Sequence, residues 1–140
     1  MTGAEGFSVY TDGAARGNPG PAAIGYAIYD SNDRIIDKDS KAVGVRTNNQ
    51  AEYEAFVWAL ERIVKMGAKD VKFYSDSELL VKQVNGQYRI KDLRLRDLHD
   101  LAQGYIDALD GFEIVHVSRQ NERTARVDQM INEELDEYER

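Results

Sequence analysis

The sequence predicts an α/β fold in which a mixed β-sheet is covered by helices. Three strand-like segments come first, at residues 7–12, 22–28 and 34–43, and turn-forming side chains at residues 30–33 separate the last two. Strand and helix patterns then alternate along the rest of the chain. An antiparallel meander followed by such alternation is typical of a mixed sheet with helices on its faces. The length of 140 residues fits one domain, which we expect to span residues 1–140.

The first strand is followed by a carboxylate and several glycines. Aromatic and β-branched residues alternate through residues 7–12, and Gly13 interrupts the pattern, so Asp12 is expected at or just past the end of this strand. A carboxylate buried there needs a cation or a hydrogen-bond network. Gly13, Gly17 and Gly20 leave room for another backbone segment to approach. The alternative is an ordinary β-turn aspartate.

Four helices and two further strands are expected after the meander. The helices cover residues 51–66, 77–84, 92–109 and 125–138, and the strands cover residues 71–76 and 112–117. Side chains at residues 47–49 are suited to cap the first helix, and Gly67 is suited to end it.

Composition restricts the chemistry. The chain has no cysteine, which excludes a disulfide scaffold, a thiolate metal site and a cysteine nucleophile. Its two histidines, His99 and His116, are too few for a histidine-based zinc site, so a metal site would have to use oxygen ligands.

The charge balance is acidic, with 18 basic against 25 acidic residues and a net charge of −7. A protein that binds nucleic acid only by neutralising phosphates is normally basic, so this balance counts against a pure binding module. It is compatible with an enzyme whose carboxylates hold divalent cations. Because the sequence contains neither a long apolar run nor a basic leader followed by an apolar one, we expect a cytoplasmic protein without membrane association.

Four acidic residues occupy positions that favour a common site. Asp12 and Asp76 follow strands, and Glu52 and Asp128 fall in the first turns of the predicted first and last helices. Such positions bring side chains together at one end of an open α/β sheet. A cluster of carboxylates would repel itself unless two Mg²⁺ or Mn²⁺ ions neutralised it, and two ions of this kind support in-line phosphoryl displacement.

Several short motifs in a fixed order carry a family resemblance. These motifs are residues 10–13, 17–20, 47–52 and 75–77, and Asp128 with residues 132–133. With them the chain resembles type 1 ribonuclease H over nearly its whole length. The resemblance implies a five-stranded mixed sheet in the order 3-2-1-4-5, with strand 2 antiparallel and helices flanking the sheet. It also implies endonucleolytic cleavage of the RNA strand of RNA–DNA hybrids, leaving 5′-phosphate and 3′-hydroxyl ends. We expect a monomer.

The resemblance also implies roles for individual residues. It assigns metal binding and catalysis to Asp12, Glu52, Asp76 and Asp128, with two Mg²⁺ or Mn²⁺ ions per site. It assigns contacts with the hybrid to Asn18, Thr47, Asn48 and Asn49. Short amide and hydroxyl side chains suit this role because they can reach 2′-hydroxyls and base edges in a shallow minor groove.

The chain departs from the family pattern at two places. The loop after the last strand lacks the family's histidine and contains Arg119 and Arg123 instead, for which contact with the substrate phosphate and simple solvation are the two alternatives. The family's basic protrusion is absent or shortened. The candidates for phosphate contacts are then Lys82, Arg89, Lys91, Arg94 and Arg96.

Three other functions remain alternatives to a hybrid-specific endonuclease. One is a hybrid-binding module with weak catalysis, which four retained carboxylates disfavour because a carboxylate cluster is costly to keep. Another is an exonuclease with a related sheet, which the absence of an Asp-x-Glu motif at Asp12 disfavours. The third is a nuclease of broader range that also cuts double-stranded RNA.

Overall fold

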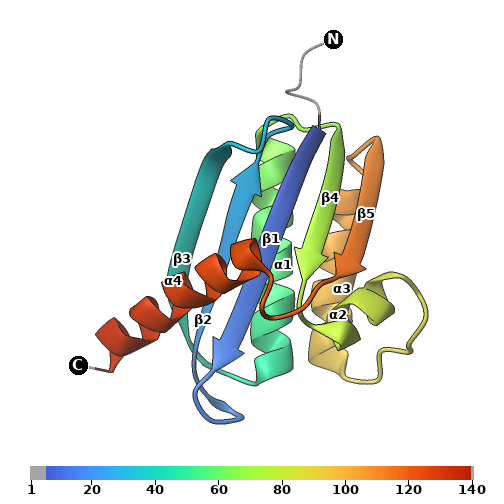
Figure 1. The fold of residues 1–140 in the computed structure, drawn as a ribbon. Helices are drawn as coiled ribbons and strands as arrows, with labels where there is room; N and C mark the ends of the chain where they lie inside the picture. Colours follow the sequence, from blue (N-terminus) through green and yellow to red (C-terminus); the bar gives the residue numbers. More distant parts are fainter. Residues whose placement is uncertain (1–5, 140) are drawn as a thin grey trace.

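Five strands form one sheet in the order β3-β2-β1-β4-β5 in the computed structural model, which describes residues 6–139 (Figure 1). The strands are β1 (Gly6–Ala15), β2 (Gly20–Tyr29), β3 (Ile35–Arg46), β4 (Asp70–Ser75) and β5 (Gly111–His116). Strand β2 is antiparallel to both of its neighbours, whereas β4 is parallel to β1 and to β5. The expected α/β class, strand order and strand directions are confirmed.

Helices cover both faces of the sheet (Figure 1). They are α1 (Asn48–Lys65), α2 (Glu78–Val84), α3 (Leu93–Ile106) and α4 (Glu122–Tyr138). Helix α1 packs on β1 and β2 from one side with α3 beside it, and α4 crosses β1, β2 and β3 on the opposite side. Within residues 6–139 no helix combines the length and the apolar character that a membrane span requires.

Strand β2 is buried on both faces, which explains its continuous apolar sequence. Tyr26 and Ile28 belong to the main core with α1, whereas Ala23 and Ala27 pack in small clusters with residues of α4. Alternation along one strand therefore assigns each side chain to one of the two helical layers.

The structure corrects three predicted boundaries that bear on the acidic residues. Strand β1 continues to Ala15 because residues up to Ala15 pair with β2, so Asp12 lies inside the strand. The parallel ladder with β4 ends earlier, at Tyr10 and Tyr74. Asp12 therefore lies just past the end of the β1–β4 ladder, although it lies within β1.

The first and last helices each begin three residues earlier than predicted. Thr47 caps α1, since its Oγ1 accepts a 3.1 Å hydrogen bond from the Gln50 N–H and its own N–H donates to Gln50 Oε1 at 3.0 Å. Asn121 caps α4. Glu52 and Asp128 consequently lie in the second turns of their helices, and the prediction that they lie in the first turns is wrong.

Candidate active site

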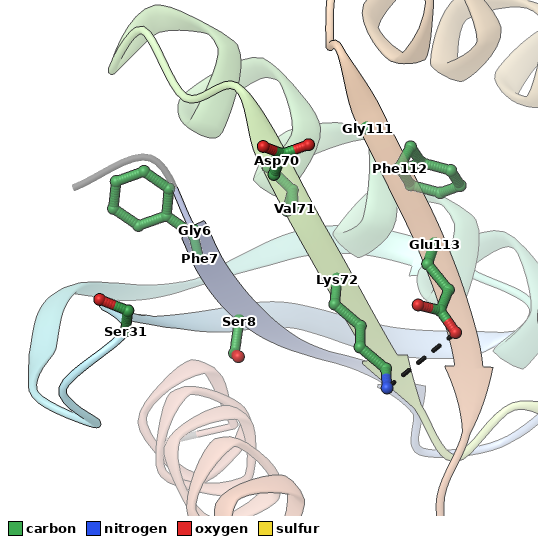
Figure 2. Close-up of a pocket in the computed structure, with 10 residues that line it drawn as sticks. All are labelled: Gly6, Phe7, Ser8, Ser31, Asp70, Val71, Lys72, Gly111, Phe112 and Glu113. Atoms are coloured by element: carbon green, nitrogen blue, oxygen red, sulfur yellow. Dashed lines mark ion pairs between the residues drawn. The ribbon is translucent and has the colours of Figure 1, made fainter. Parts of the chain in front are cut away.

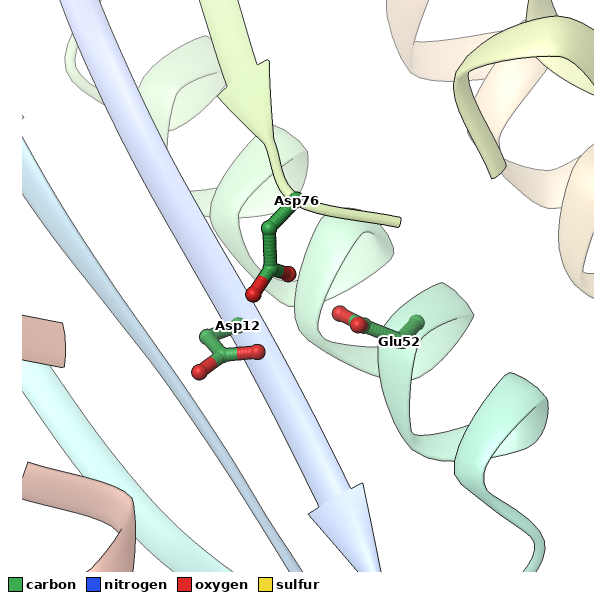
Figure 3. A group of neighbouring side chains, drawn as sticks. All are labelled: Asp12, Glu52 and Asp76. Atoms are coloured by element: carbon green, nitrogen blue, oxygen red, sulfur yellow. The ribbon is translucent and has the colours of Figure 1, made fainter. Parts of the chain in front are cut away.

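Three carboxylates converge at the end of the β1–β4 ladder. Asp12 in β1, Glu52 in α1 and Asp76 after β4 each offer one oxygen, and these oxygens all lie within 4.8 Å of one another (Figure 3). Asp128 of α4 lines the same hollow, which has a volume of about 340 Å³. The structure thus brings together all four predicted acidic residues.

Gly13 allows α1 to approach β1. A Cβ atom at this position would overlap the backbone carbonyl of Ala51 in α1, so a residue with a side chain would hold the helix away. The Gly13 N–H donates to Oδ1 of Asp12 at 2.9 Å and to Oε1 of Glu52 at 3.1 Å. One backbone amide therefore orients two of the carboxylates.

Asp76 is held against the cluster with little access to solvent. Its side chain is 8% exposed, and its Oδ1 is buried without a hydrogen-bond partner among the described residues. Arg119 approaches the other oxygen, with its Nε 3.6 Å from Oδ2. An unpaired buried carboxylate oxygen is costly unless a cation coordinates it, so the site fits a bound metal ion.

Burial and mutual repulsion raise the proton affinity of the cluster. Burial is the main cause that raises the pKa of Asp12 to about 8, and the charges of Asp76 and Asp128 raise it further. Burial, followed by the charges of Asp12 and Asp76, also raises the pKa of Glu52 well above its ordinary value. Clustered carboxylate oxygens are the ligands that Mg²⁺ and Mn²⁺ prefer, and such ions would offset this repulsion.

A second hollow, of about 500 Å³, lies at the amino-terminal ends of the parallel strands, at the opposite end of the sheet (Figure 2). Lys72 and Glu113, which line it, form an ion pair of 4.0 Å with each other. Sites in open α/β sheets lie at the carboxyl ends of the strands, where the acidic cluster is found. The acidic end of the sheet is therefore the candidate active site.

The residues expected to contact a hybrid lie next to the acidic hollow. Asn48 lines that hollow, and its Oδ1 accepts a 2.8 Å hydrogen bond from the Ala15 N–H. The Asn48 N–H donates to Oδ1 of Asn18 at 3.0 Å. Asn18, Thr47 and Asn49 line an adjoining hollow of about 440 Å³. The four residues thus form a continuous polar rim that leads away from the carboxylates.

Two of the predicted basic residues border this adjoining hollow, namely Arg89 and Lys91. The loop that carries them is anchored by buried Gln83, whose Nε2 donates to the Arg89 carbonyl at 3.1 Å. The Tyr53 hydroxyl in turn donates to Gln83 Oε1 at 2.6 Å. A chain of two hydrogen bonds, from Tyr53 of α1 through Gln83 of α2, therefore fixes this basic loop beside the polar rim.

The two arginines expected in the loop after β5 are not equivalent, because Arg119 lies in that loop whereas Arg123 lies in the first turn of α4. Arg119 lines the acidic hollow, and 83% of its side chain is exposed. Arg123 lies outside that hollow: its guanidinium stacks 3.8 Å from the ring centre of Tyr29 and pairs with Asp33 at 3.0 Å. The structure thus brings only Arg119 to the carboxylates.

Gly25 is a residue of the site that the sequence patterns did not single out. It pairs with Asp12 across the β1–β2 ladder, and its missing side chain makes room for α4. A glycine inside an otherwise apolar strand often marks a close backbone approach, and this signal was present in residues 22–28. The register that places it opposite Asp12 is visible only in the structure.

Comparison with known proteins agrees with this architecture. Residues 10–127 match the family model described as reverse transcriptase-like. Ribonuclease HI of Halobacterium salinarum is 38% identical over 128 residues, which are 91% of this chain and 63% of that protein. A bifunctional protein of Mycobacterium tuberculosis is 33% identical over 91% of this chain and 35% of its own length. The chain thus spans less than two thirds of each of these relatives.

Solved structures give the same result. The crystal structure of RNase H1 from Halobacterium salinarum superposes with a TM-score of 0.90 at 37% identity, over 94% of this chain and 98% of that one. LC11-RNase H1, solved in complex with an RNA/DNA hybrid, superposes with a TM-score of 0.89 at 35% identity, over 96% of this chain and 99% of that one. On the fold, the family model and these similarities, the chain belongs to the type 1 ribonuclease H family.

Proposed function

We propose that this chain is an endonuclease that hydrolyses the RNA strand of RNA–DNA hybrids with the help of two Mg²⁺ or Mn²⁺ ions. The observation that carries this proposal is the group of oxygens from Asp12, Glu52 and Asp76 within 4.8 Å of one another. Asp128 in the same hollow supplies a fourth carboxylate. A relative with 35% identity was solved with an RNA/DNA hybrid, which supports the substrate class. We also propose that residues 1–140 act as one domain.

The four carboxylates would divide the metal ligation between them. Asp12 in β1 and Asp76 just after the neighbouring β4 would hold the ions at the centre of the site, while Glu52 and Asp128 would add ligands from helices on opposite faces of the sheet. Two divalent ions would supply a deprotonated water as nucleophile and neutralise the charge on the leaving oxygen. Water attacks phosphorus in line and the bond to the 3′ oxygen breaks, which leaves a 5′-phosphate and a 3′-hydroxyl.

The polar rim is proposed to hold the hybrid. Asn18, Asn48 and Asn49 offer amide donors and acceptors that can bind 2′-hydroxyls and base edges of the minor groove. The Thr47 hydroxyl accepts a bond from Gln50 but keeps its own proton for a phosphate oxygen. Of the two arginines expected to bind substrate, Arg119 is the one whose position suits the charge that develops on the scissile phosphate.

Endonuclease activity is favoured over simple hybrid binding by the acidity of the site. Four clustered carboxylates would repel a nucleic acid backbone unless cations were bound between them. The alternative of a broader nuclease that also cuts double-stranded RNA rests on the same cluster and differs only in substrate range.

The test compares substrates and variants. An RNA–DNA hybrid labelled on its RNA strand is incubated beside the same RNA as a single strand and as an RNA duplex, with Mg²⁺, Mn²⁺ or EDTA. We expect metal-dependent cleavage of the hybrid only, loss of activity in Asp76→Asn, and full activity in Glu113→Gln, an exposed acid of the neighbouring strand. Hybrid binding without cleavage under any metal would contradict the proposal, and cleavage of the RNA duplex would favour the broader nuclease.

A further inference from the structure

Helix α4 lies on the sheet along one ridge of side chains. Arg123, Val127 and Ile131 recur every fourth residue and so line up on one side of the helix. Opposite them, β2 turns alternate residues toward the helix. Arg123 stacks on Tyr29, Val127 packs in a cluster that includes Tyr29, and Ile131 packs in a cluster with Ala23, which lies nearer the start of β2. The contact therefore runs from a large aromatic residue at one end to small residues at the other.

The closest approach on this ridge is at Gly25. A Cβ atom there would lie 2.9 Å from Cγ2 of Ile131 and 3.2 Å from Cγ1 of Val127. Both side chains are fully buried, so neither can swing aside without cost. A side chain at position 25 would therefore push the middle of α4 away from the sheet.

Both ends of α4 are held by arginines. At the first turn Arg123 pairs with Asp33 at 3.0 Å in addition to its stacking on Tyr29. At the last turns Arg16 pairs with Asp136 at 2.8 Å and Glu139 at 3.0 Å. These contacts fix the direction of the helix axis, and the close approach at Gly25 fixes the distance between the middle of α4 and the sheet.

The distance of α4 from the sheet matters for the acidic site because of the strand register. Gly25 and Asp12 are paired residues of adjacent antiparallel strands, so their side-chain positions face the same side of the sheet, which is the side of α4. Asp128 directly follows Val127, whose methyl group contacts the Gly25 position. A shift of α4 at Gly25 would therefore also move Asp128 relative to Asp12.

We propose that Gly25 is a positioning residue whose missing side chain sets the separation of the Asp128 and Asp12 carboxylates and thereby the affinity for the ion that Asp128 helps to hold. This inference rests on the proposed function, since it assumes that the carboxylates bind divalent metal. Gly25 touches neither substrate nor metal, and its effect is transmitted through Val127 and Ile131.

The test measures Mn²⁺ binding to the full chain by isothermal titration calorimetry without nucleic acid, so it does not depend on catalysis. The wild type, Gly25→Ala, Asp128→Asn and the double variant of these two substitutions are compared. We expect Gly25→Ala to weaken Mn²⁺ binding by about 10-fold or more, which is the usual effect of disturbing the groups that hold a metal-ligating side chain in position. We expect no further weakening when Gly25→Ala is added to Asp128→Asn, because both changes remove the same ligand.

A rescue experiment separates positioning from a general loss of stability. In Gly25→Ala/Ile131→Ala the closest overlap is removed and only the 3.2 Å approach to Val127 remains, so most of the lost Mn²⁺ affinity should return even though the smaller core residue makes the fold less stable. Leu135→Ala is the matched control, because Leu135 is buried on the same helix one turn beyond Ile131. It should lose stability and keep the wild-type Mn²⁺ affinity.

The inference is overturned if Gly25→Ala binds Mn²⁺ like the wild type, or if its loss persists in the Asp128→Asn background. It is also overturned if Mn²⁺ affinity follows stability through the Leu135→Ala and rescue variants. A wild-type chain that binds no Mn²⁺ and cuts no hybrid would instead remove the proposed function itself, so the two failures are distinguishable.

Discussion

The backbone N–H of Gly13 donates a 3.1 Å hydrogen bond to Oε1 of Glu52, a carboxylate 39 residues later in the chain. The same N–H donates to Asp12 at 2.9 Å. This amide is the point where β1 and α1 meet in the acidic hollow, and it exists in this position only because Gly13 lacks a side chain.

Gly13→Ala tests this junction. The added methyl group would overlap the Ala51 carbonyl, so α1 must shift and carry Glu52 with it. We expect hybrid cleavage to fall about 100-fold, since small misplacements of catalytic groups have effects of that size. The free energy of unfolding in urea should fall by about 1–3 kcal/mol. The control is Gly104→Ala in α3, where a Cβ meets no atom within 4 Å; it should keep full activity, and a similar loss there would refute the explanation.

Asp12→Asn tests the electrostatics of the cluster. The raised pKa of Asp12, about 8 against an ordinary 3.8, means that the metal-free folded chain retains a proton that the unfolded chain loses near pH 4. The resulting stabilisation is complete below about pH 4 and is lost as the pH rises toward 8. Asparagine cannot ionise, so at pH 8 in EDTA the variant should be more stable than the wild type by ~1 kcal/mol or more. Urea unfolding at pH 5 and pH 8 measures this, and equal pH dependence in both proteins would contradict it.

Metal addition should reverse the same destabilisation. Mn²⁺ at about 100 times its dissociation constant should raise the free energy of unfolding by about 2.7 kcal/mol at pH 8. The increase should shrink at pH 5, because binding must then displace protons from Asp12 and Glu52, whose pKa values are raised. Thermal unfolding with and without Mn²⁺ checks both statements. An increase of the same size in Asp76→Asn would show that the ion binds elsewhere.

Arg89 and Lys91 are expected to bind substrate phosphates. Replacing both with alanine should weaken hybrid binding and lower the slope of log K against log salt concentration by about 0.9 for each phosphate that is no longer neutralised. Binding is measured by fluorescence anisotropy in Ca²⁺ over a range of salt concentrations. Arg94→Ala serves as control, because Arg94 is exposed on α3 and does not line the hollow beside the polar rim. An unchanged salt slope in the double variant would exclude a role of these two residues in phosphate binding.

Much of the fold follows from local patterns in the sequence. The alternation in residues 7–12 and the capping side chain of Thr47 mark elements that the structure contains. Helix starts were predicted less well for α1 and α4, because cap geometry at Thr47 and Asn121 decides them within a run of polar residues. Sequence position was therefore enough to group the four acidic residues, but it did not give the correct helical turn for Glu52 and Asp128.

What local patterns could not supply is register and long-range packing. The pairing of Asp12 with Gly25 depends on how β1 and β2 align, and the position of α4 on the sheet depends on that pairing. Arg123 shows the same limit. Sequence position puts it beside Arg119 in one loop, whereas stacking on Tyr29 and pairing with Asp33 direct it away from the carboxylates.

The ends of the cleaved RNA distinguish metal-activated water from other nucleophiles. A hybrid is cut in water enriched in ¹⁸O with Mg²⁺, and the RNA fragments are examined by mass spectrometry. The two-metal mechanism predicts fragments with a 3′-hydroxyl and a 5′-phosphate that carries one ¹⁸O atom, because a water molecule attacks phosphorus and the 3′ oxygen leaves. Fragments that end in a 2′,3′-cyclic phosphate would show that the RNA's own hydroxyl is the nucleophile, and cleavage that continues in EDTA would show that no divalent metal is needed. Either result would contradict the four-carboxylate mechanism.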